Sequence, residues 1–183
     1  MTVAARPQPD TLPGELLMWV LILSELLVFG AGFAVLLGLR LTDPPGFAAA
    51  QVRLDQPVAA ANTALLITSG WLAARGLAAA RSGAAARCRI SLLAAALLGC
   101  GFLILKAHDY AALADQGIGM ESHPFFTFFF LLTGFHAAHV AAGILLLIGV
   151  AWSAQPAGVE VATAFWHMVD LIWVLLLPVV YLL

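Results

Sequence analysis

Charge is scarce in this sequence. Only 10% of its 183 residues are charged, whereas 63% are hydrophobic, and the mean hydropathy is +1.01. A soluble globular domain carries about 25% charged residues. The composition therefore excludes a mainly soluble protein. The net charge of −2 is too small to indicate binding to nucleic acid.

Cysteine and lysine are also scarce. The two cysteines, Cys88 and Cys100, lie twelve residues apart and match neither a zinc motif nor a disulfide framework. Lys106 is the one lysine. We therefore expect neither a cysteine-based zinc site nor a disulfide framework.

Long hydrophobic runs dominate what is present. A helix that crosses a bilayer needs about 20 apolar residues. Five runs meet this requirement, at residues 16–38, 57–77, 90–108, 124–152 and 161–183. The sequence predicts an all-α integral membrane protein, in which an N-terminal arm (1–14) precedes one domain (15–183) of five transmembrane helices. Residues 39–56 are predicted to form a polar loop.

Basic residues are distributed unequally between the two sides of this predicted bundle. The side of the N-terminal arm carries five, and the other side carries three. Because cytoplasmic loops are enriched in arginine and lysine, we expect a cytoplasmic N-terminus and an external C-terminus. The five are Arg6, Arg75, Arg81, Arg87 and Arg89; the three are Arg40, Arg53 and Lys106.

Ionisable side chains nevertheless occur inside the hydrophobic runs. A helix rises about 1.5 Å per residue, which places five of them at a similar depth: Glu25, His136, His139, His167 and Asp170. A second cluster is predicted at the outer end of the third run: Lys106, His108 and Asp109. Such groups are costly in hydrocarbon, so they usually face protein, water or a partner.

Three interpretations of the intramembrane layer remain open. Histidine pairs on facing helices can hold a metal or haem. Glu25 near histidines has the composition of a proton relay. The third interpretation is structural pairing, in which acids and histidines neutralise each other, and it is the one we favour. We expect Glu25 to be protonated or tightly paired, because burial disfavours an isolated charge.

Small and aromatic residues predict some of the helix packing. Gly134, Ala138 and Ala142 repeat every four residues, a pattern that lets membrane helices approach closely. Trp166 and Trp173 lie deep enough to need partners for their indole N–H groups. Aromatic residues near span ends, Tyr181 among them, are expected to be interfacial anchors.

Four short motifs together resemble a known family. They are Ser24-Glu25 followed by Phe29, Asn62-Thr63 followed by Thr68-Ser69, the block 133–140 (TGFHAAHV), and the block 165–170 (FWHMVD) with Trp173. In this order they resemble subunit III of the haem-copper oxidases. The number of spans resembles the short, five-helix bacterial form of that subunit.

The resemblance implies a non-catalytic subunit in the bacterial inner membrane. Haem and metals would belong to a partner, the catalytic subunit, whose stability and proton uptake this chain would support. A phospholipid would be bound in a cleft between helices. Glu25 matches the buried carboxylate of the family's Ser-Glu motif, and His136, His139, His167 and Asp170 match its other intramembrane polar positions.

One departure opens an alternative. Lys106 followed by Asp109-Tyr110, and then by Gly117, resembles a subgroup of these subunits that accompanies nitric oxide reductases in denitrification. An accessory role beside such a reductase is therefore a second hypothesis. An independent proton-conducting or haem-binding membrane protein is a third.

Overall fold

The chain folds into five long helices and one short helix. The computed structural model describes residues 16–182, so the arm predicted over 1–14 lies outside the described residues. The helices are α1 (Leu16–Thr42), α2 (Pro44–Gln51), α3 (Gln56–Arg81), α4 (Ala85–Asp115), α5 (Pro124–Ser153) and α6 (Pro156–Leu177), followed by a π-helical turn, η1 (Pro178–Leu182). Five of them are long and apolar enough to cross a membrane, which confirms the predicted fold class.

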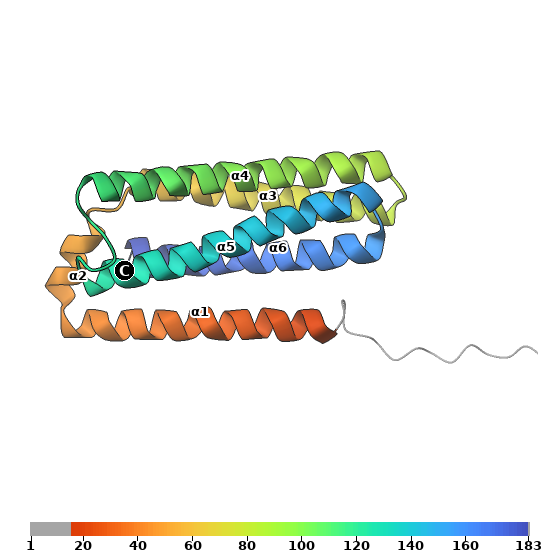
Figure 1. Cartoon of the computed structure of the whole chain (residues 1–183). Coiled ribbons are helices and arrows are strands. Elements are labelled where there is room, and N and C mark those ends of the chain that lie inside the picture. Colours follow the sequence, from red (N-terminus) through yellow and green to blue (C-terminus); the bar gives the residue numbers. More distant parts are fainter. Residues whose placement is uncertain (1–15, 183) are drawn as a thin grey trace, which may run out of the picture.

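Helices α3, α4, α5 and α6 form a four-helix bundle, and α1 lies along one side of it (Figure 1). Helix α1 packs mainly against α5 and α6. Many of its apolar side chains, including Val20, Leu23 and Leu27, are exposed. Because most of α1 is not covered within this chain, its outer surface is available to lipid or to another subunit.

Trp166 of α6 joins all four helices of the bundle. Its indole ring lies so close to Gly99 of α4 and Gly143 of α5 that a Cβ atom at either glycine would be 2.7 or 2.6 Å from it. Its N–H group donates to the Ser69 hydroxyl of α3 at 3.0 Å. Trp173 likewise donates to Thr63 at 3.0 Å. The predicted need of both indoles for partners is thus confirmed.

The predicted loop 39–56 is wrong, because α2 occupies much of it. Asp43 is the N-cap of this helix, and its carboxylate accepts a hydrogen bond from the Gly46 N–H at 3.1 Å. Pro44 and Pro45 occupy the first turn, where a missing N–H costs nothing. The same two prolines predict a loop only when the capping aspartate before them is overlooked.

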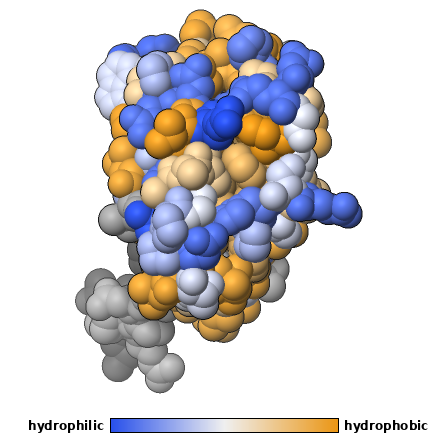
Figure 2. Space-filling view, turned by 90° about the vertical axis from the view of Figure 1, so that its left-hand side faces the viewer, coloured by the Kyte–Doolittle hydropathy of each residue, from blue (hydrophilic) through white to orange (hydrophobic). Residues whose placement is uncertain are grey.

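Helix α2 ties together the end of the molecule that Figure 2 shows, where hydrophilic side chains gather. Asp43 contacts His123 Nε2, at the start of α5, at 3.2 Å. Gln51 donates to the Val180 carbonyl at 2.9 Å, and Gln56 of α3 donates to the Tyr181 carbonyl at 3.3 Å. These side chains satisfy carbonyls in the last turn of η1, where carbonyl groups have no N–H partner within the helix.

Candidate functional site: paired polar side chains inside the helices

Glu25 of α1 and His139 of α5 face each other across the one side of α1 that is covered. Glu25 Oε2 lies 3.2 Å from His139 Nε2, and both side chains are largely buried. The contact is close but is not aligned as a hydrogen bond. It is the one ion pair that joins α1 to the bundle within the described residues. Phe29, one turn further along α1, packs edge-on against the His139 ring.

The hydrogen bonding of His139 determines how many protons this pair holds. His139 Nδ1 lies 2.8 Å from the Phe135 carbonyl, which can only accept, so Nδ1 carries a hydrogen. If His139 is neutral, its Nε2 then carries no hydrogen, and the lone pair on Nε2 faces the negatively charged Glu25 carboxylate. A hydrogen on either His139 Nε2 or the Glu25 carboxyl group would remove this repulsion.

His136 is separate from this pair. It is 0% exposed, and neither ring nitrogen has a hydrogen-bond partner within residues 16–182. Its ring stacks on Trp173 at 5.3 Å and meets Phe102 edge-on at 5.5 Å. An aromatic cage of this kind suits a neutral imidazole, because a cation there would lack a counter-charge.

His167 and Asp170 form a third unit, on α6. His167 Nδ1 lies 3.6 Å from Asp170 Oδ2, and the carboxylate rests against α3 at Gly70. A Cβ atom at Gly70 would lie 2.2 Å from Asp170 Oδ2, so only glycine admits the carboxylate here. His167 is about half exposed, whereas Asp170 is mostly buried behind it.

The predicted layer of five polar residues therefore separates into three places. Glu25 meets His139, His167 meets Asp170, and His136 stands alone; no hydrogen bond or ion pair among the described residues joins the three. Within that part of the chain, no three histidine, cysteine, aspartate or glutamate side chains are grouped to hold a metal ion. The arrangement can hold protons in pairs, but it does not form a shared ligand set.

Lys106 and Asp109 form a buried ion pair near the other end of the bundle. Their charged atoms are 2.8 Å apart, and the side chains are 2% and 5% exposed. Lys106 Nζ also donates to the Tyr181 hydroxyl at 2.7 Å, and that hydroxyl donates to Asp109 at 3.3 Å. The ammonium group lies 4.6 Å from the Phe129 ring centre and 5.7 Å from that of Trp173. Aromatic faces stabilise such a cation.

Two expectations for this cluster are wrong. His108 is exposed and takes no part in it, because a residue two positions from Lys106 points to another side of the helix. Tyr181 is 2% exposed and completes the cluster rather than anchoring at the interface. Its role depends on the helix turn after Pro178, which sequence periodicity does not show.

The small-residue stripe does not lie in a helix interface of this chain. Ala138 and Ala142 are exposed, and a Cβ atom at Gly134 would meet only the Tyr110 hydroxyl, at 3.7 Å. Close helix packing instead occurs at Gly143 and Gly99. Within the described residues the stripe therefore makes no close helix contact, and its expected role in helix packing or subunit association stays a prediction.

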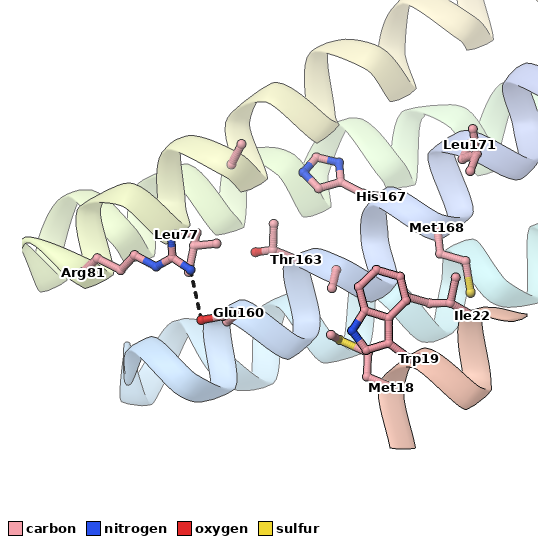
Figure 3. Close-up of a pocket in the computed structure, with 12 residues that line it drawn as sticks. Met18, Trp19, Ile22, Leu77, Arg81, Glu160, Thr163, His167, Met168 and Leu171 are labelled. Carbon is pink, nitrogen blue, oxygen red and sulfur yellow. Dashed lines mark ion pairs between the residues drawn. The ribbon is translucent and has the colours of Figure 1, made fainter. Parts of the chain in front are cut away.

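Two pockets flank α1 in its N-terminal half. One, of about 470 Å³, lies between α1, α3 and α6, and the other, of about 450 Å³, lies between α1, α5 and α6. The second has an almost wholly apolar wall, which includes Val20, Leu146 and Phe165. The first is bordered by the Arg81–Glu160 ion pair (3.0 Å) and by His167 (Figure 3).

Comparisons with known proteins agree with this architecture. A sequence model of the family described as cytochrome c oxidase subunit III matches residues 15–183. The chain is 34% identical to cytochrome c oxidase subunit 3 of Thermostichus vulcanus over 176 residues, which cover 90% of this chain and 84% of the relative. It is 30% identical to the probable cytochrome c oxidase subunit 3 of Mycobacterium tuberculosis (strain ATCC 25618 / H37Rv), with 86% and 82% covered. It is 28% identical to cytochrome c oxidase subunit 3 of Bacillus sp. (strain PS3), with 99% and 93% covered. The chain belongs to the cytochrome c oxidase subunit III family.

Proposed function

We propose that this chain, a non-catalytic subunit of a haem-copper oxidase, stabilises the catalytic subunit and supports its proton uptake. The observation that carries this proposal is the pairing of intramembrane polar groups. Glu25 is matched by His139, Asp170 by His167, and Asp109 by Lys106. Each acid has a basic neighbour inside this chain, which suits a subunit that scaffolds a partner rather than one that holds a reaction centre.

Helix α1 supplies the surface that we assign to the partner. Its exposed residues are apolar over most of its length, and Gly30 and Gly38 have open space beside them. On the opposite side of the bundle, α3 and α4 pack against each other. The Gly134–Ala138–Ala142 stripe on α5, in which both alanines are exposed, is a second surface that another membrane helix could approach.

The Glu25–His139 pair is the group that we assign to proton support. A hydrophobic carbodiimide should modify Glu25 in preference to the other acids, because this reagent partitions into lipid and needs a protonated carboxyl group. Uniform labelling of all acids would contradict the assignment. If the chain were an independent channel, proteoliposomes of the wild type would leak protons faster than those of a Glu25→Gln variant; we expect equal leak.

A lipid acyl chain fits the almost wholly apolar pocket between α1, α5 and α6. Ser24 and Val161 border this pocket, and no described charged residue lines it. Its volume of about 450 Å³ would accept part of an acyl chain. The substitution Val161→Trp should narrow this pocket and reduce the amount of lipid that remains bound after purification, as measured by mass spectrometry of the extracted complex.

The arginine distribution supports a cytoplasmic N-terminus. Arg75, Arg81, Arg87 and Arg89 lie near the turn between α3 and α4, at the end of the bundle where α1 begins (Figure 1). Arg89 also donates to the Trp152 carbonyl at 3.1 Å and lies over its ring, which fixes it at the end of α5. We propose that this end faces the cytoplasm.

Affinity purification in mild detergent, read by haem spectroscopy and subunit mass, tests the partner. The matching relatives bear cytochrome c oxidase names, so we expect copper and a-type or o-type haem to co-purify. Recovery of b-type and c-type haem with non-haem iron, and without copper, would assign the chain to a nitric oxide reductase. Recovery without any haem protein would refute the proposal.

A further inference from the structure

A row of polar side chains runs along one face of α6. Glu160, Thr163, His167 and Asp170 follow each other at spacings of three, four and three residues, which places them on one side of a helix. Figure 3 shows the first three in sequence along the wall of the pocket between α1, α3 and α6. The row spans about 15 Å, or half the hydrocarbon thickness.

The Arg81–Glu160 ion pair lies at one end of the pocket beside this row (Figure 3). Both side chains are partly exposed. The charged or titratable groups that face His167 are Arg81 from α3 and Glu160 and Asp170 from α6. The residues described on the α1 wall, including Met18 and Ile22, carry no titratable group.

Two polar atoms of the row have no hydrogen-bond partner within the described residues. They are Thr163 Oγ1, in a residue only 3% exposed, and Asp170 Oδ1. An unsatisfied polar group in hydrocarbon costs several kcal/mol, because lipid tails cannot hydrogen-bond. The pocket holds about 470 Å³, enough for several waters at about 30 Å³ each. Both atoms are themselves enclosed by protein, so the polar groups that water in the pocket can reach are His167, about half exposed, and the Arg81–Glu160 pair.

We propose that this pocket is a water-filled crevice through which His167, backed by Asp170, exchanges protons with the aqueous phase at the Arg81–Glu160 end. A hydronium ion gives its proton to His167 Nε2 and becomes water, while Nδ1 releases its own proton to the Asp170 carboxylate 3.6 Å away, so the imidazole ends neutral. His136 and the Glu25–His139 pair lie outside this pocket. The inference does not depend on which partner subunit co-purifies.

Cysteine accessibility in membrane vesicles tests whether the crevice contains water. His167 lies eleven residues from the start of α6, and Leu27 lies eleven residues from the start of α1, at the same end of the bundle. Leu27 is 72% exposed and lines neither pocket, so His167→Cys and Leu27→Cys compare crevice with lipid at matched depth. The probe is a charged, membrane-impermeant methanethiosulfonate, and the wild type gives the background of the native cysteines.

We expect the thiol at position 167 to react at least about ten-fold faster than the thiol at 27, because only the thiolate reacts and hydrocarbon suppresses it. Equal, slow reaction at both positions, with fast labelling of both by a lipid-soluble maleimide, would show an acyl chain in the pocket and overturn the proposal. Should His167→Cys not fold, Ala74→Cys on the α3 wall replaces it, with Leu23→Cys as the control. Both positions lie seven residues from a helix end on that side.

Nitrogen NMR of the full chain tests the exchange of protons directly. In nanodiscs with ¹⁵N-labelled histidine, the ring signals of His167 should move with buffer pH and exchange with water. Those of caged His136 should do neither, and His167→Gln identifies the signal. A His167 signal as unresponsive as that of His136 would overturn the proposal.

Discussion

Removing the charge of Lys106 should destabilise the chain far more than its single ion pair would at a surface. Lys106→Met keeps most of the side chain but leaves the Asp109 carboxylate, 5% exposed, with only the Tyr181 hydroxyl at 3.3 Å. Breaking a buried pair by removing one partner costs about 3–5 kcal/mol. At about 2–4 °C per kcal/mol for a chain of this size, the unfolding midpoint should fall by roughly 6–20 °C.

The double variant Lys106→Met/Asp109→Asn separates this cost from the net value of the pair. With neither charge buried, most of the lost stability should return, because a buried ion pair often does little more than offset its own desolvation. The assay is thermal unfolding in detergent followed by tryptophan fluorescence, which Trp173, 5.7 Å from the ammonium group, should report. His108→Gln, on the exposed side of the same turn, is the control and should shift the midpoint little. If Lys106→Met is as stable as the wild type, or less damaged than the double variant, the reasoning is refuted.

Two further predictions concern packing and pH. Gly143→Ala should lower the free energy of unfolding by about 1–3 kcal/mol, because the new Cβ atom collides with Trp166. Gly149→Ala, with nothing within 4 Å, should raise it by up to about 1 kcal/mol through helix propensity. Equal effects of the two variants on the unfolding midpoint would contradict the assigned packing. The hydrogen bond from His123 holds the pKa of Asp43 below its usual range, so the carboxylate stabilises the fold at neutral pH and this contribution disappears as the pH falls through the lowered pKa. Unfolding midpoints measured down to about pH 3 should therefore fall more steeply for the wild type than for Asp43→Asn, and parallel curves would exclude the effect.

The spans could be predicted from the sequence because hydrophobic length is a direct physical requirement of the bilayer. Partners for the deep tryptophans could be predicted for a similar reason, since an indole N–H in hydrocarbon must find an acceptor. In the structure the acceptors are Ser69 and Thr63, both of which belong to the family motifs of the sequence. Both predictions follow from the free-energy cost of placing polar groups in hydrocarbon, which does not depend on how the helices pack against each other.

The orientation of each helix could not be predicted in this way. Lipid and protein interior are both apolar, so a stripe of small residues does not show which of the two it faces. Gly134 and Gly143 have similar apolar neighbours in the sequence, yet only Gly143 meets another helix closely. His136 and His139 share a helix face by spacing, but the 60° between them is enough to direct one to Trp173 and the other to Glu25.

The one contact between Glu25 and His139 also helps to determine the rotation of α1 about its own axis. This helix is apolar on nearly every side, and its buried Phe29 and Leu36 lie on the same side as Glu25. Turning it by one residue, about 100°, would carry Glu25 away from its partner and toward lipid. The ion pair, together with the packing of Phe29 and Leu36, therefore determines which face of α1 points outward. A substitution at Glu25 or His139 would therefore change which residues of α1 the subunit presents to its neighbour, although none of those residues had itself been replaced.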